Sequence, residues 1–244
     1  MIPLQDDNPS ERSPVVTIGF IAICVFVFFY QASLPPQPGE MFVFQYGAIP
    51  AILFGQADLP PAIAVGIPAY ATVITSMFLH GGWMHLIGNM LYLWIFGDNV
   101  EDVMGHVRFV VFYLTCGILA ALSHALTDPT STIPMVGASG AISGVLGAYL
   151  VLFPRARIHT LVIFFFITFL ELPATFVLLA WFVLQLFSGV GEMGRELGSG
   201  GIAYWAHVGG FVFGLAVTWL FFRSRGRRDP YALPPPPPPC SPIA

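Results

Sequence analysis

Long apolar segments recur along the chain, and short polar, glycine-rich or proline-rich stretches separate them. A helix that crosses a lipid bilayer needs about 20 mostly apolar residues. Six segments reach or approach that length, at residues 15–34, 83–100, 107–126, 139–153, 173–190 and 203–222. The pattern predicts an all-α, polytopic membrane protein, folded as a bundle of six transmembrane helices.

Three of the intervening stretches have a distinctive composition. Residues 35–80 contain seven prolines, so we expect a long loop with short helices at the membrane interface. Residues 159–170 are apolar, but Glu171-Leu172-Pro173 separates them from the fifth helix, which predicts a segment that re-enters the membrane. Residues 191–202 hold five glycines, and we expect a mobile loop there.

The fourth apolar segment, residues 139–153, is shorter than the others because Pro154 and two arginines follow it. At about 1.5 Å per residue, a helix of this length does not cross the ~30 Å hydrocarbon core. Its first residue, Ser139, is therefore expected below one membrane surface, inside a cavity.

The composition supports a membrane protein independently of these segments. Of the 244 residues, 56% are hydrophobic and only 9% are charged, whereas soluble domains average about 25% charged residues. The three cysteines, Cys24, Cys116 and Cys240, lie far apart and form neither a zinc motif nor a disulfide framework. We expect no metal, no cofactor and no nucleic-acid partner.

The arginines predict the orientation in the membrane. The chain has nine basic residues and no lysine, and with six spans only Arg195 falls on one side. Eight arginines on the other side predict that both termini are cytoplasmic. The expected parts are a cytoplasmic segment (1–14), the membrane domain (15–222) and a basic, proline-rich tail (223–244). Short loops and the lack of a transit peptide indicate a bacterial inner membrane.

Polar residues inside the predicted helices cluster near the outer side. His85 and Asn89, four residues apart, share one face of the second helix. Ser139 begins the fourth helix, and His207 lies near the outer end of the sixth. Polar groups within a membrane are expensive and usually functional, so three such groups on one side predict a common site.

These residue types suit acyl transfer. A serine hydroxyl becomes a nucleophile when a histidine takes its proton. The developing oxyanion needs hydrogen-bond donors, which the Ser139 backbone N–H at a helix start and the side chains of His85 and Asn89 offer. Gly137 and Gly140 leave room for a backbone or a substrate to approach Ser139.

Each element also has a simpler explanation. The glycines around Ser139, with Gly210 and Gly214 below His207, are also typical of helices that pack closely in a membrane. His207, His85 and Asn89 could be hydrogen-bonding links between helices. A metal pair of His80 and His85 is disfavoured because a spacing of five residues is poor helix geometry for ligands.

Taken together, the motifs resemble the rhomboid family of intramembrane serine proteases. The resemblance covers about residues 75–222, roughly three fifths of the chain. Its motifs are His80 with His85 and Asn89, the Gly97–Gly105 stretch that contains Glu101, Gly137-Ala-Ser139-Gly140, and Ala206-His207-Val-Gly-Gly210 with Gly214.

The resemblance implies a role for each residue. Ser139 would be the nucleophile and His207 its base, while His85 and Asn89 would help form the oxyanion hole. The glutamate and glycine pattern after the second helix would close the cytoplasmic end. Substrates would be membrane proteins with a single, helix-poor transmembrane segment. Two features depart from many members of the family: Ala71-Thr72 is the nearest equivalent of a Trp-Arg pair in the first loop, and Ser143 stands where many bacterial members have a tyrosine that stacks on the histidine.

We therefore expect an intramembrane endopeptidase with a Ser139–His207 dyad. No acidic residue lies in the outer half of any predicted helix, so we expect packing and neutral hydrogen bonds to hold His207. The alternative is a catalytically silent rhomboid-like protein that binds or escorts membrane clients. A transporter is disfavoured because paired carboxylates within spans are absent from the sequence pattern.

Overall fold

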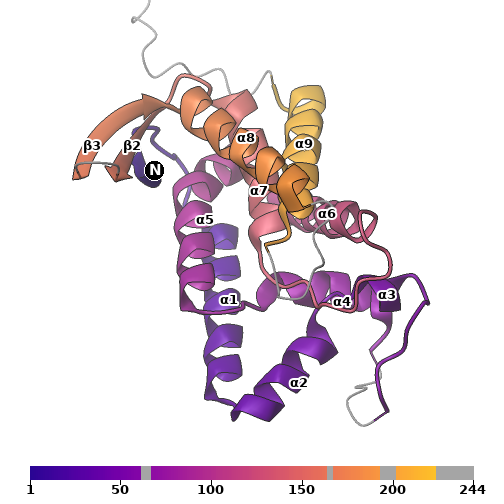
Figure 1. Cartoon of the computed structure of the whole chain (residues 1–244). Helices are drawn as coiled ribbons and strands as arrows, with labels where there is room; N and C mark the ends of the chain where they lie inside the picture. The colour runs from indigo at the N-terminus through magenta and orange to yellow at the C-terminus, as the bar shows by residue number, and fades with distance from the viewer. Residues whose placement is uncertain (62–66, 164–166, 193–201, 224–244) are drawn as a thin grey trace, which may run out of the picture.

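A computed structural model describes residues 1–61, 67–163, 167–192 and 202–223 (Figure 1). The predicted tail and most of the glycine-rich loop lie outside these ranges. Each of the six predicted apolar segments forms a helix. The helices are α1 (Val15–Ser33), α5 (Trp83–Met104), α6 (His106–Ala125), α7 (Ser139–Leu152), α8 (Ala174–Glu192) and α9 (Tyr204–Phe221).

Four helices in the described part of the chain are long and apolar enough to cross a membrane: α1, α6, α8 and α9. The other two differ from them in composition or length. Helix α5 carries Asp98, Glu101 and Asp102 near its end, and α7 has only 14 residues. The protein is therefore mostly helical and integral to the membrane, and the number of six crossings stays a prediction.

The proline-rich stretch after α1 forms short helices, as predicted. They are α2 (Pro36–Tyr46), α3 (Pro50–Leu53), α4 (Ala69–Thr75) and the 3-10 helix η1 (Ser76–Phe78). Prolines occupy the first turn of α2 and α3, where no backbone N–H is needed. An isolated β-bridge joins Ala48 to Met135, so this stretch contacts the loop before α7.

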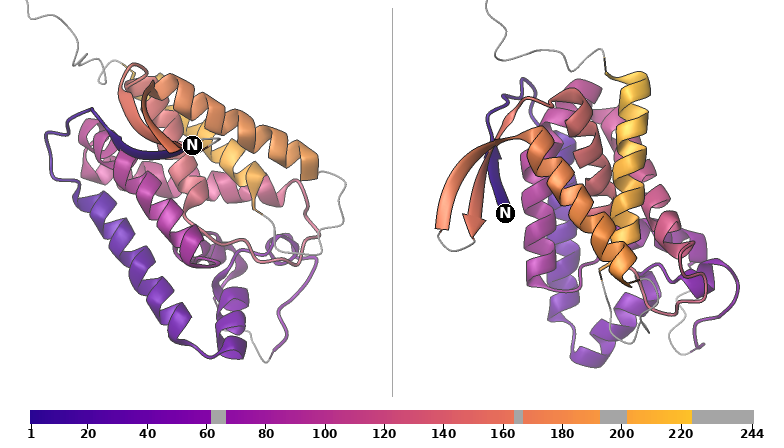
Figure 2. Two further views of the ribbon diagram at one scale, coloured as in Figure 1. Left: turned by 60° about the vertical axis from the view of Figure 1, so that its left-hand side comes forward. Right: turned by 45° about the horizontal axis from the view of Figure 1, so that its top comes forward.

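A three-stranded antiparallel sheet corrects the all-α expectation. Its strands are β1 (Ile2–Asp6), β2 (Arg157–Ile163) and β3 (Ile167–Pro173), in the order β1-β2-β3. The predicted re-entrant segment is thus a hairpin, with Ile158 paired to Leu172. Isoleucine, valine, threonine and phenylalanine make up half of the residues in β2 and β3 and favour strands over helices. Figures 1 and 2 show the sheet at one end of the bundle and α2–α4 at the opposite end.

The N-terminal segment is attached to the membrane domain at several points. Strand β1 pairs with β2, and the Asp6 carboxyl group accepts a hydrogen bond from the Tyr149 hydroxyl on α7. The Glu101 carboxylate accepts the backbone N–H groups of Val16 and Thr17 at 2.9 and 2.8 Å. Since no side chain of its own caps α1, Glu101 supplies the acceptors that a helix start requires.

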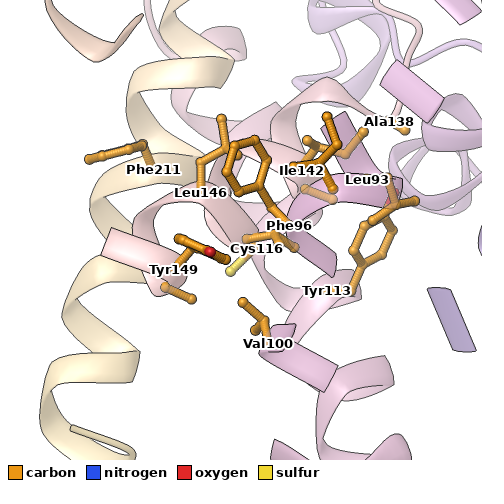
Figure 3. Packing of buried hydrophobic residues seen from close by; sticks show 14 of the residues in the cluster. Leu93, Phe96, Val100, Tyr113, Cys116, Ala138, Ile142, Leu146, Tyr149 and Phe211 are labelled. Atoms are coloured by element: carbon orange, nitrogen blue, oxygen red, sulfur yellow. The ribbon is translucent and has the colours of Figure 1, made fainter. Parts of the chain in front are cut away.

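Helix α7 lies at the centre of the bundle. Almost all of its residues are buried, and large side chains from the neighbouring helices converge on it. Figure 3 shows Phe96 of α5, Cys116 of α6 and Phe211 of α9 around Leu146 of α7. This packing places the first residue of α7 against the first turn of α9, where the candidate site lies.

Candidate active site

The hydroxyl of Ser139 and the imidazole of His207 form a hydrogen-bonded pair. The distance between Ser139 Oγ and His207 Nε2 is 2.8 Å. Ser139 begins α7 and is partly exposed, whereas His207 lies in the first turn of α9 and is buried. The two residues predicted as nucleophile and base therefore lie within hydrogen-bonding distance, although 68 positions separate them in the chain.

Glycines make this approach possible because they bring the backbones of α7 and α9 into direct contact. A Cβ atom at Gly210 would clash with the Gly140 carbonyl oxygen, and one at Gly214 with the Gly144 carbonyl oxygen. A Cβ at Gly147 would clash with the Phe211 carbonyl oxygen. The helix-packing explanation of these glycines is thus correct, and the same packing brings Ser139 to His207.

Gly137, two residues before Ser139, needs to be glycine for two reasons. Its φ angle is +123°, a region that L side chains rarely adopt. A Cβ atom there would also lie 2.6 Å from His85 Nε2. Its N–H donates to the Ser76 carbonyl at 2.9 Å, which anchors the turn before α7.

His85 and Asn89 border this turn, as predicted from their spacing on α5. His85 Nδ1 accepts the Gly81 N–H at 3.3 Å, so in the neutral ring Nε2 carries the proton and faces Gly137 as a donor. Asn89 is buried, and its Nδ2 has no hydrogen-bond partner among the described residues. That atom lies 3.6 Å from where a Gly137 Cβ would stand, so both side chains present donors beside the start of α7.

The sequence analysis missed Gln185, on α8. Its Oε1 atom lies 2.7 Å from His207 Nδ1, so each ring nitrogen of His207 has a neutral partner. A signal was available, because Gln185 is the only amide side chain in the apolar segment 173–190 and polar groups within spans are usually functional. Its partner is 22 positions away on another helix, which sequence spacing does not reveal.

At both departures from the family pattern, the residue present forms a hydrogen bond within its own helix. Ser143 Oγ donates to the Ser139 carbonyl at 2.6 Å, so it bonds to its own helix. Two aromatic rings lie near His207 instead, with centroid distances of 5.8 Å for Trp181 and 6.4 Å for Tyr204. In α4, Thr72 is buried and donates to the Ala69 carbonyl at 2.6 Å.

The described part of the chain contains no cluster of side chains that could bind a metal ion. No group of three or more His, Cys, Asp or Glu side chains there is arranged to hold an ion. The rings of His80 and His85 pack edge to face with centroids 5.2 Å apart. The arrangement of donors around Ser139 instead suits acyl transfer to a serine hydroxyl.

Fold and site together define a helical integral membrane protein with a serine–histidine pair at the start of a short central helix. Comparison with known families agrees, because the Rhomboid domain model matches residues 68–224. The chain belongs to the rhomboid family.

Relatives come from several kingdoms. The chain is 32% identical to Rhomboid protein 1, mitochondrial, of Saccharomyces cerevisiae, over 63% of this chain and 42% of that protein. It is 32% identical to Rhomboid protease GluP of Bacillus subtilis, over 56% of this chain and 24% of that protein. The chain thus spans less than half the length of these relatives. Since both mitochondrial and bacterial proteins match, the expected bacterial inner membrane gains no support over a mitochondrial one.

Proposed function

We propose that this protein is an intramembrane serine endopeptidase that cleaves transmembrane segments of single-span membrane proteins. The observation that carries the proposal is the 2.8 Å hydrogen bond between Ser139 Oγ and His207 Nε2. A serine hydroxyl within hydrogen-bonding reach of a histidine is the arrangement that nucleophilic catalysis requires.

In the proposed reaction, Ser139 Oγ attacks the peptide carbonyl carbon while His207 Nε2 takes the hydroxyl proton. The carbonyl oxygen becomes an oxyanion, and the donors for it are His85 Nε2, Asn89 Nδ2 and the Ser139 backbone N–H. His207 then gives its proton to the leaving amine, and an acyl-enzyme remains. Water from the outer side attacks the acyl carbon, with His207 again as base, and restores Ser139.

The site suits a substrate segment with little helical structure. A peptide carbonyl inside a helix is hydrogen-bonded and shielded by side chains, so it does not reach Ser139 without local unwinding. Small or helix-breaking residues near the cleaved bond reduce the free energy of that unwinding. The proposed partners are the lipid bilayer and such substrates, with both termini of the protease in the cytoplasm.

Labelling with a fluorophosphonate probe tests the proposal. The purified protein in detergent should react at Ser139, identified by mass spectrometry of the modified peptide, and both Ser139→Ala and His207→Ala should abolish labelling and cleavage of a transmembrane reporter. Thermal unfolding of each variant controls for folding. An intact, well-folded wild-type protein that neither labels nor cleaves would favour the silent escort function instead.

A further inference from the structure

We propose that Gln185 is the positioning residue for His207, taking the place that a carboxylate holds in soluble serine proteases. The inference rests on the proposed function, because it assigns a role toward the base of that reaction. The Oε1 atom of Gln185 accepts the Nδ1–H of His207 and thereby holds the imidazole in the one tautomer that is a base toward Ser139.

The two hydrogen bonds of His207 form a continuous chain. Gln185 Oε1 lies 2.7 Å from Nδ1, and Ser139 Oγ lies 2.8 Å from Nε2. A neutral imidazole has one donor and one acceptor nitrogen, and a side-chain carbonyl only accepts. With the proton on Nδ1, the lone pair of Nε2 faces the Ser139 hydroxyl. The opposite tautomer would place a proton on Nε2, which then could not accept the serine proton.

Packing of α8 against the start of α9 holds Gln185 in place. Trp181, Gln185 and Gly189 are spaced four residues apart and share one face of α8. The Trp181 ring lies beside His207, tilted by 36° with the ring centroids 5.8 Å apart, and a Cβ at Gly189 would already lie 3.3 Å from the side chains of Trp205 and Tyr204. The small residue lets the helices approach closely, so one helix face supplies both the ring and the amide that contact His207.

A neutral acceptor suits this location better than a carboxylate. A buried charge within a membrane protein is expensive without a partner, whereas an amide orients the ring without adding a charge. An amide also stabilises the imidazolium that forms during the reaction less than a carboxylate would. Replacing Gln185 by glutamate should therefore keep an acceptor at Nδ1 and change the pH dependence in a defined direction, whereas replacing it by leucine removes the acceptor and should leave the tautomer of His207 unselected.

The experiment compares Gln185→Leu, Gln185→Glu and a control, Leu184→Ala, in the full-length protein. Leu184 is 60% exposed on α8, and its aliphatic side chain cannot form a hydrogen bond to His207. Gln185→Leu should lower kcat by about 10- to 100-fold, with KM within about twofold, because the tautomer is no longer selected. Leu184→Ala should keep wild-type kcat, and all variants should unfold at similar temperatures.

Gln185→Glu should keep much of the kcat that Gln185→Leu loses. It should also move the acid limb of the pH–rate profile to higher pH. A neighbouring carboxylate favours the imidazolium, so the neutral base forms only at higher pH. His85 and His124 are further titratable groups near His207, and Tyr204 lies beside it, so the profile of each variant is compared with that of the wild type. Wild-type kcat in Gln185→Leu, or equal losses and unchanged profiles in both variants, would overturn the proposal.

Imidazole ¹⁵N NMR separates this proposal from the proposed function. In the resting wild-type protein, His207 should show a protonated Nδ1 and an unprotonated Nε2, with His207→Ala used for assignment. In Gln185→Leu the two tautomers should both be populated. This measurement does not depend on turnover, so an inactive wild type with the expected tautomer would count against the protease and not against Gln185. A mixed tautomer in the wild type would count against Gln185 alone.

Discussion

Replacing Gly214 by alanine should separate α9 from α7 and so disable the Ser139–His207 pair without touching either residue. Gly214 lies about two turns below His207 on α9. A Cβ atom there would clash with the Gly144 carbonyl oxygen and lie 2.5 Å from the Gly144 Cα. An ordinary contact needs 3.4 Å or more, so the backbones must separate locally by about 1 Å.

The expected loss follows from that displacement. Misplacing a reacting group by about 1 Å can lower a rate by about 10²-fold, and overpacking a tight interface costs about 1–3 kcal/mol of stability. Gly214→Ala should therefore lower kcat on a transmembrane reporter by about 100-fold. It should also lower the unfolding temperature in detergent, while the variant still inserts into the membrane.

The matched control is Gly19→Ala on α1, where a Cβ atom would meet nothing within 4 Å. This variant should keep both the wild-type kcat and the wild-type unfolding temperature, or gain slightly in stability because alanine favours helices. If Gly214→Ala behaves like Gly19→Ala in both measurements, the close contact between α7 and α9 does not set the geometry of the site.

Three further predictions concern other parts of the molecule. His85→Ala and Asn89→Ala should each lower kcat about 10²- to 10³-fold with little change in substrate binding, because oxyanion donors act in the transition state; unchanged kcat in both would refute the role. Asp128→Asn and Ser143→Ala should change kcat less than about tenfold, since neither side chain bonds to His207, and a thousandfold loss in Asp128→Asn would indicate a carboxylate triad. Burial raises the pKa of the Asp6 carboxyl group to about 7. The folded state therefore binds the Asp6 proton more tightly than the unfolded chain does. The free energy of unfolding should then fall as pH rises from about 4 to 7. Asp6→Asn should flatten that dependence of the unfolding temperature, and equal slopes would exclude Asp6 as its source.

The apolar segments of the sequence predicted every long helix of the bundle, because helices in a bilayer must satisfy their own backbone hydrogen bonds and must be apolar to do so. The same reasoning identified Ser139 and His207, since polar residues inside such segments are few. The sequence predicted an apolar re-entrant segment after the fourth helix, but it did not predict that this segment is the hairpin of β2 and β3. Its apolar run matches a buried strand and a membrane segment equally well, and the deciding partner, β1, lies more than 150 positions away.

The sequence by itself thus determined where the long helices of the described part of the chain lie, the candidate nucleophile and base, and the small residues between them. Only the tertiary structure decided which groups contact His207, how Glu101 caps α1, and why Gly137 has no side chain. These features depend on pairs of residues on different elements, such as Gln185 on α8 and His207 on α9. A periodic pattern reports which face of one helix is apolar, but distances between two helices depend on how their backbones pack, and that packing is a property of the assembled bundle.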